Sequence, residues 1–240
     1  MTFYKTIVCL ANSRKEGGRC VAGKEIVNNQ ISQNWIRPVS RSQMGELSAK
    51  NTILHNGKLP KWLSSLIMLF KTRKPQPKML DIISVPVIQH KPHAYQSENY
   101  LIDDKQRWIK QQTLPATQLH QLCDSVPSLW INGYHSSNGV NDRIPLEIAT
   151  KSINTSLLLI KPENLSILVK KELNRTKIRA EFYFNRQQYR LIVTEPKVES
   201  IYRFKAGGKY PITEEVYLCI SLGEPFEGYS YKLVAAVINA

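Results

Sequence analysis

Apolar and polar residues alternate in short runs along most of the chain, the period-two pattern of half-buried β-strands. Gly, Pro, Asn or Ser bounds most of these runs. Residues 59–71 differ, because their apolar side chains fall on one helical face, and 115–123 also favour a helix. The predicted strands of the first half are 5–11, 19–26, 35–39 and 80–87, and those of the second half include 178–184, 189–194, 216–222 and 231–238.

Each half of the chain thus offers four or five short strands and one helix, the element count of a small closed barrel such as an OB-fold. The centre, residues 125–150, is irregular and polar, which suggests a domain boundary there. We therefore expect a mostly β protein with two OB-like antiparallel barrels and a few short helices. The predicted domains are 1–125 and 126–240.

The net charge says more about possible partners than the rest of the composition does. The formal net charge is +14 with a sequence pI of about 9.6. Residues 1–120 hold 18 Lys and Arg against 7 Asp and Glu, or +11, whereas residues 121–240 hold 15 against 12, or +3. A basic first domain favours polyanionic partners, because released counterions drive binding to phosphates. The alternative is a basic protein that has no such partner.

Other features narrow the class of protein. The apolar run near the N-terminus is too brief for a signal sequence, and the longest apolar stretch, 63–70, is far shorter than the roughly 20 residues of a membrane span. The four cysteines form no CxxC pair, although Cys9 and Cys20 could face each other on adjacent strands. We expect a cytoplasmic protein with reduced thiols, no membrane contact, no metal and no cofactor.

The most informative segment is the Ser-Arg-Lys-Glu-Gly-Gly-Arg stretch at 13–19, where a strand ends, turns at glycines and returns. Ser13, Arg14, Lys15 and Arg19 supply hydroxyl and cationic donors, and a glycine turn lets backbone amides approach an anion. This pattern predicts a phosphate clamp, although it is neither a P-loop nor a Rossmann fingerprint. The alternative is an ordinary hairpin with solvated charges.

Three further polar groups could contact a ligand. Trp35 and Arg37 lie two positions apart on one strand face, where a base could stack; alternatively, Trp35 fills the barrel and Arg37 pairs with a carboxylate. The polar segments 95–99 and 141–143 could read base edges or simply cap turns. No catalytic motif is present, and Ser13 or Cys20 would become a nucleophile only if a base lay nearby, so the sequence leans away from an enzyme.

Seven segments spread over nearly the whole chain resemble the bacterial dual OB-containing domain family. That resemblance implies two successive OB-like barrels, binding of nucleic acid or nucleotides, and a setting in phage defence. The connection at 55–78 is longer and more basic than the family pattern. The segments are 6–26, 34–40, 79–87, 95–102, 141–145, 189–196 and 217–238. The site residues that the resemblance implies are Ser13, Arg14, Lys15, Arg19, Lys24, Trp35, Arg37, Gln96, Glu98, Asn99, Asp142 and Arg143.

Three functions remain open from the sequence. The first is a protein that binds single-stranded DNA or RNA, as a non-catalytic component of a prokaryotic defence or nucleic-acid-processing system. The second is a sensor of a nucleotide or modified base that uses the 13–19 turn as its phosphate clamp. The third is a scaffold subunit that docks onto an enzyme partner. Exposed aromatics along a groove would favour the first, a closed pocket the second and a large apolar patch the third.

Overall fold

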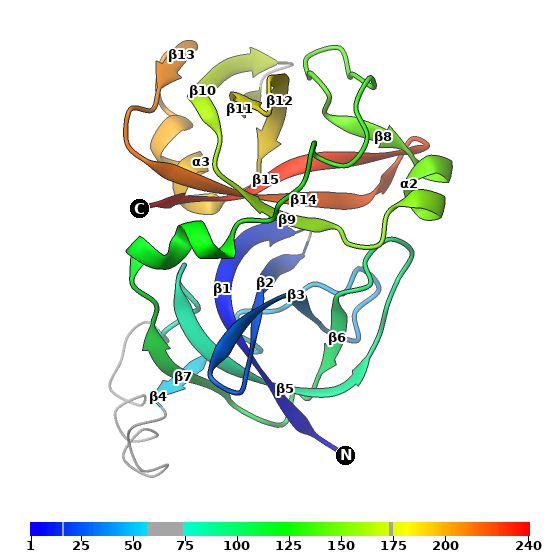
Figure 1. Cartoon of the computed structure of the whole chain (residues 1–240), viewed down its shortest axis with the longest axis vertical. Coiled ribbons are helices and arrows are strands. Elements are labelled where there is room, and N and C mark those ends of the chain that lie inside the picture. The colour runs from blue at the N-terminus through cyan, green and yellow to red at the C-terminus, as the bar shows by residue number, and fades with distance from the viewer. Residues whose placement is uncertain (16, 57–73, 173–174) are drawn as a thin grey trace. The chain divides into compact units, whose positions relative to one another are not determined.

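The computed structural model describes residues 1–15, 17–56, 74–172 and 175–240 (Figure 1). The chain is mostly β, as predicted. The helix expected over 59–71 lies outside the described residues. The strands are β1 (Phe3–Lys15), β2 (Gly18–Val27), β3 (Gln30–Val39), β4 (Leu54–Asn56), β5 (Asp81–His90), β6 (Asn99–Ile102), β7 (Trp108–Thr113), β8 (Arg143–Pro145), β9 (Leu157–Ile160), β10 (Glu163–Glu172), β11 (Arg175–Phe184), β12 (Gln187–Val193), β13 (Gly208–Pro211), β14 (Val216–Phe226) and β15 (Tyr229–Asn239).

The helices in the described parts of the chain are short. They are the 3₁₀ helix η1 (Ala116–Leu122), where the sequence predicted a helix, and the α-helices α2 (Leu146–Ser152) and α3 (Pro196–Tyr202). None of them is long and apolar enough to cross a membrane.

The chain divides into two compact units. Unit 1 comprises residues 1–93 and 98–118, and unit 2 comprises residues 94–97 and 119–240. The second unit therefore begins earlier than the residue 126 expected from the sequence. It also includes four residues from the connection between β5 and β6, which no local pattern in the sequence indicated.

The sheet of unit 1 closes on itself as an OB-fold does. β1 pairs with β2, β2 with β3, β3 in parallel with β6, β6 with β5, and β5 returns to β1. β1 pairs with β5 over residues 3–8 and with β2 over residues 6–15, so residues 6–8 pair with both strands, and a bulge lies between Cys9 and Ala11. Five strands in this order, with one parallel pair, form the Greek-key barrel. β7 and β4 extend the sheet beyond β5.

Unit 2 has the same strand order with one difference. β10 pairs with β11, β11 with β12, β12 in parallel with β15, and β15 with β14. β14 then pairs with β9, which ends two residues before β10 begins. The first barrel strand is thus broken at Lys161 and Pro162, and Pro fits here because it cannot donate to a ladder. α3 lies between the third and fourth barrel strands in sequence.

Two-residue turns join the long hairpins. Asn28 and Asn29 have φ of 51° and 62°, and Asn185 and Arg186 have φ of 47° and 62°. Positive φ at both central residues is the signature of type I′ turns, whose twist matches that of the strands. The predicted polar connection at 185–188 is therefore shorter than expected. The segment 223–230, expected as a connection, is mostly strand, with only Glu227 and Gly228 in the turn.

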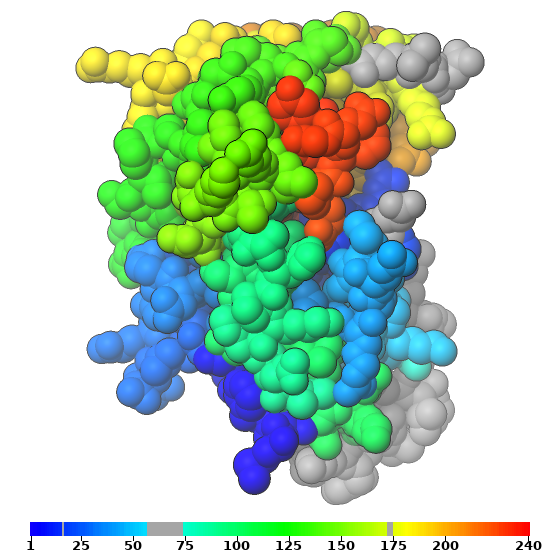
Figure 2. Space-filling model, turned by 90° about the vertical axis from the view of Figure 1, so that its right-hand side faces the viewer, coloured from blue at the N-terminus to red at the C-terminus, as the bar shows by residue number. Residues whose placement is uncertain are grey.

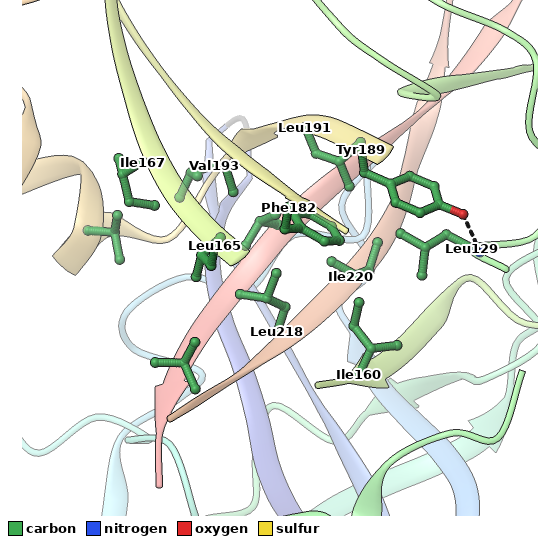
Figure 3. Close-up of a cluster of buried hydrophobic side chains, with 14 of the residues drawn as sticks. Leu129, Ile160, Leu165, Ile167, Phe182, Tyr189, Leu191, Val193, Leu218 and Ile220 are labelled. Carbon is green, nitrogen blue, oxygen red and sulfur yellow. Dashed lines mark hydrogen bonds between the residues drawn. The ribbon is translucent and has the colours of Figure 1, made fainter. Parts of the chain in front are cut away.

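Each unit has its own apolar core. In unit 1 it includes Ile7, Ile36 and Trp108. In unit 2 the main core gathers strand residues around Phe182 and Tyr189, whose rings stack at 5.5 Å (Figure 3). The Tyr189 hydroxyl accepts a hydrogen bond from the Leu129 amide at 3.2 Å, which satisfies the polar end of a fully buried ring.

The bulge of β1 generates a stability prediction at Gly23, which lies opposite Cys9. A Cβ added at Gly23 would sit 1.9 Å from the Val8 carbonyl oxygen, a backbone clash that no rotamer change relieves. We expect Gly23→Ala to lower the free energy of unfolding by more than about 3 kcal/mol in urea denaturation. Gly207→Ala is the control, since its Cβ would have only ordinary contact, at 3.6 Å from the Val169 oxygen. Equal stability of the two variants would contradict this account of the bulge.

Candidate functional site

The 13–19 segment forms the end of the β1–β2 hairpin. Arg14 lies directly opposite Arg19 in the antiparallel register, so both side chains extend from the same face. Both are exposed, and Lys15 next to them is half-buried. Like charges directly opposite each other destabilise a strand pair. This hairpin end therefore concentrates positive charge on one face.

The backbone of this hairpin is already hydrogen-bonded at Arg19. Its amide donates to the Leu47 oxygen at 2.9 Å, and the Leu47 amide donates back to the Arg19 oxygen at 2.8 Å. Ser13 is buried, with 6% of its surface exposed. A clamp here would consequently depend on the guanidinium and ammonium groups, rather than on the Arg19 amide or the Ser13 hydroxyl.

Lys24 and Trp35 lie together inside unit 1. The Lys24 ammonium lies 5.6 Å from the centre of the Trp35 ring and donates to the Gln33 side-chain oxygen. Lys24 is fully buried, and Trp35 is 7% exposed. Trp35 does not belong to the apolar core of the barrel, which holds its neighbour Ile36; it lies on the opposite face of β3, where it is buried beside Lys24. A buried indole offers no open face to a base.

Arg37 forms a buried ion pair with Glu98. Their charged atoms lie 3.1 Å apart, and their side chains are 3% and 2% exposed. The backbone amide of Arg37 also donates to the backbone carbonyl oxygen of Glu98 at 2.8 Å. Asn99 is the partner of Arg37 in the parallel pairing of β3 with β6. The three residues thus join β3 to β6 at the parallel pair that closes the barrel, and Arg37 pairs with a carboxylate as the alternative interpretation expected.

The remaining predicted residues belong to unit 2. Gln96 donates to Glu224 at 3.2 Å. Asp142 accepts from the Ser136 amide at 2.7 Å and from the Ser136 hydroxyl, which closes the loop before β8. The role of Asp142 is therefore to cap a turn, whereas Gln96 joins segments far apart in the sequence. Of the twelve predicted residues, the exposed ones lie at the end of the β1–β2 hairpin, and most of the others are buried.

Arg143 is the exception among the unit 2 residues. Its guanidinium lies 3.9 Å from the centre of the Tyr229 ring, at the tip of the β14–β15 hairpin. Phe226 and Tyr231 neighbour it, with ring centres 6.4 Å apart. Phe226 and Tyr229 were not predicted as site residues, because 223–230 was expected to be a connection, and Tyr231 was expected only as a strand residue. Their alternation with small residues could have identified them.

A buried lysine in unit 2 was also missed. The Lys232 ammonium donates to the Ile131 oxygen at 2.7 Å and to the Asn132 side-chain oxygen at 3.1 Å, and it lies 5.5 Å from the Tyr189 ring centre. Burial lowers the pKa of Lys232 to about 7, against the opposing charge of Asp142. In the sequence, Lys232 is simply the polar position of an alternating strand, so no local signal marks it.

The described residues include no metal centre. No group of three or more His, Cys, Asp or Glu side chains gathers there as metal ligands would. Cys9 and Cys20 do not face each other: Cys9 lies opposite Gly23, and Cys20 lies opposite Ser13. Burial raises the pKa of Cys9 to about 12, so this thiol is protonated at neutral pH.

The Arg37–Glu98 pair yields a prediction about stability. Glu98→Gln leaves a buried guanidinium without its carboxylate, and we expect a loss of about 3 kcal/mol in the free energy of unfolding. The double variant Arg37→Met, Glu98→Leu removes both charges and should recover most of that loss, because the desolvation cost disappears with them. Chemical denaturation of the three proteins measures this. A Glu98→Gln variant as stable as the parent would show that the pair does not hold β3 to β6.

Lys232 yields a pH-dependence. Its pKa is about 7 in the folded protein and 10.5 in the unfolded chain, so between these values the unfolded chain binds one more proton. The free energy of unfolding should therefore rise with pH in this window, by about 1.4 kcal/mol per pH unit, and this contribution should be flat below pH 7. Lys232→Met should lack the slope. Urea denaturation of both proteins at pH 7, 8 and 9 checks the difference, and parallel pH profiles would contradict it.

The comparison with protein families agrees with this topology. The family model described as "Dual OB-containing domain" matches residues 5–75 and 68–237. The two matched segments meet in the connection between β4 and β5, inside unit 1. No curated protein sequence matches the chain. With matches that span nearly its whole length and two rings of OB strand order, this chain belongs to the dual OB-containing domain family.

Proposed function

We propose that this protein binds single-stranded DNA or RNA, and that the end of the β1–β2 hairpin contacts the phosphates. The observation that carries the proposal is the pair of exposed arginines, Arg14 and Arg19, held opposite each other on adjacent strands. OB-folds commonly bind oligonucleotides through the face of their second and third strands and the loop between the first and second. The β1–β2 turn is that loop in unit 1.

The charge distribution supports the same proposal. Residues 1–120 carry an excess of +11, counted as 18 Lys and Arg minus 7 Asp and Glu. The buried cations Lys24 and Arg37 belong to this excess but are engaged inside the unit, so the exposed ones must supply the phosphate contacts. The cross-strand hydrogen bonds between Arg19 and Leu47 fix the backbone under the arginine pair, which reduces the entropy lost when a ligand binds.

The family resemblance adds a setting to this proposal. In it, the protein is a non-catalytic component of a prokaryotic defence or nucleic-acid-processing system. Delivery of single strands to an enzyme partner would need binding without strong sequence preference, and charge-based contacts to phosphates provide that.

Replacement of both arginines tests the proposal. Arg14→Ala with Arg19→Ala should weaken binding of a 20-nucleotide single strand by at least about 2 kcal/mol at low salt, roughly 30-fold. It should also reduce the slope of log affinity against log salt by about 1.4, since each phosphate contact on a single strand contributes about 0.7. Fluorescence anisotropy with DNA and RNA single strands and with a duplex, over a series of KCl concentrations, measures both quantities.

The matched control is Arg175→Ala with Lys177→Ala, which removes two exposed cations from β11 and changes the net charge equally. It should leave the affinity within about two-fold of the parent. Equal losses in the two double variants would mean that affinity follows net charge and not this hairpin. An unchanged salt slope in a folded Arg14, Arg19 variant would remove the hairpin from the interface.

A further inference from the structure

An aromatic face at the tip of the β14–β15 hairpin is the strongest unexplained feature of unit 2. Phe226 lies opposite Tyr229, and Tyr231 lies opposite Arg143 of β8. Tyr229 and Tyr231 are two positions apart on β15, so the four side chains extend from the same face of these three strands. Phe226 is 61% exposed, and the other three are half-buried. We call these four residues the aromatic face.

The opposite face of the same strands is core. Ser230 and Ile144 are both fully buried. The Ser230 hydroxyl lies 2.7 Å from the Tyr95 hydroxyl, which in turn donates to the Gly223 carbonyl oxygen. On the outside of the tip, the Leu146 amide at the start of α2 donates to the Gly228 oxygen at 2.9 Å. These contacts on the opposite face hold the hairpin tip in place, so its aromatic face is preorganised. The tip is red in Figure 2.

Arg143 lies between two tyrosines of this face and is hydrogen-bonded to the Tyr231 side chain. Its guanidinium contacts the Tyr229 ring at 3.9 Å, and no carboxylate among the described residues lies within ion-pair distance of it. Its Nε is buried and has no hydrogen-bond partner in the described part of the chain. An arginine that stacks on an aromatic ring is a common surface for planar ligands, since a guanidinium and a ring both stack on a base.

The charges around the tip favour a base over a phosphate. Glu224 and Glu227 lie on either side of Phe226 along the chain, and Glu227 is exposed. Carboxylates repel phosphate oxygens but accept hydrogen bonds from exocyclic amino groups of bases. This surface therefore differs in kind from the β1–β2 hairpin end, which gathers arginines.

We propose that the aromatic face stacks one unpaired nucleobase, with Phe226 as its exposed ring. The inference rests on the proposed function only in that a single strand presents such a base. Stacking on an aromatic side chain tolerates any base, because every base has a π-face. It also releases no counterions, so its contribution to affinity does not depend on salt.

A fluorescent base tests this directly. Single strands of 20 nucleotides with one 2-aminopurine, whose emission falls when it stacks, are titrated with the parent, Phe226→Ala and Phe226→Trp. The parent should quench the probe; Phe226→Ala should lose the quenching and about ten-fold in affinity at an unchanged salt slope, and Phe226→Trp should restore both. The control is Phe204→Ala, which removes a phenylalanine that is 89% exposed. Thermal melts of all variants confirm folding, which an exposed side chain should scarcely affect.

The outcomes separate the two proposals. If the parent binds the strands with the expected salt slope but Phe226→Ala behaves like Phe204→Ala, the aromatic face is not a base site and the proposed function stands. If the parent binds no strand, titration with free 2-aminopurine riboside decides. Quenching by the parent that Phe226→Ala loses would support the base site without the nucleic-acid function, and no quenching would overturn both.

Discussion

The fold of both units depends on a first barrel strand that pairs with two neighbours at once. In unit 1, residues 6–8 of β1 pair with β2 and β5 together, and a strand that closes a five-stranded sheet in this way has to bend. In unit 1 the bend is a bulge between Cys9 and Ala11, accommodated by Gly23, which allows close approach of the Val8 carbonyl. In unit 2 the chain breaks the strand at Lys161 and Pro162. The same requirement is met by a glycine in one unit and by a proline in the other.

The place of a cation in the sheet determines whether it reaches solvent. Lys24 and Arg37 lie on the sheet face opposite the core residue Ile36, and both are buried and partnered there. Arg14 and Arg19 lie beyond the closed part of the sheet, at the end of a long hairpin. Net charge therefore overstates the charge that a ligand meets.

Much of the fold was predictable from the sequence, because alternation and turn residues report local geometry. The strands around Ile7, Val21 and Leu218 and the OB-like element count followed from that pattern. The hairpin turn at Asn185 and Arg186 was placed too broadly, since a strand can continue through polar residues such as Gln187. The burial of Arg37 with Glu98 was one of two open alternatives, because pairing between β3 and β6 spans some sixty residues and leaves no local signal. Lys232 was missed for the same reason.

Of the candidate binding surfaces, one could be predicted from the sequence and the other could not. Charge and glycines identified the β1–β2 hairpin, whereas the aromatic face needed the register between β8, β14 and β15, which brings Arg143 against residues far along the chain. No pattern within one strand contains that information.

Because segment 94–97 belongs to unit 2 but lies between strands of unit 1, neither unit is one continuous stretch of sequence. Tyr95 is 1% exposed within the core of unit 2, where its hydroxyl meets Ser230 and Gly223, yet it is encoded between two strands of unit 1. A fragment that starts at residue 119 would contain every strand of the second barrel and still lack one of its largest core side chains. Such a fragment would have all the strands of the second barrel but a gap in its core where Tyr95 packs. Dividing the chain at one point therefore cannot yield two complete domains.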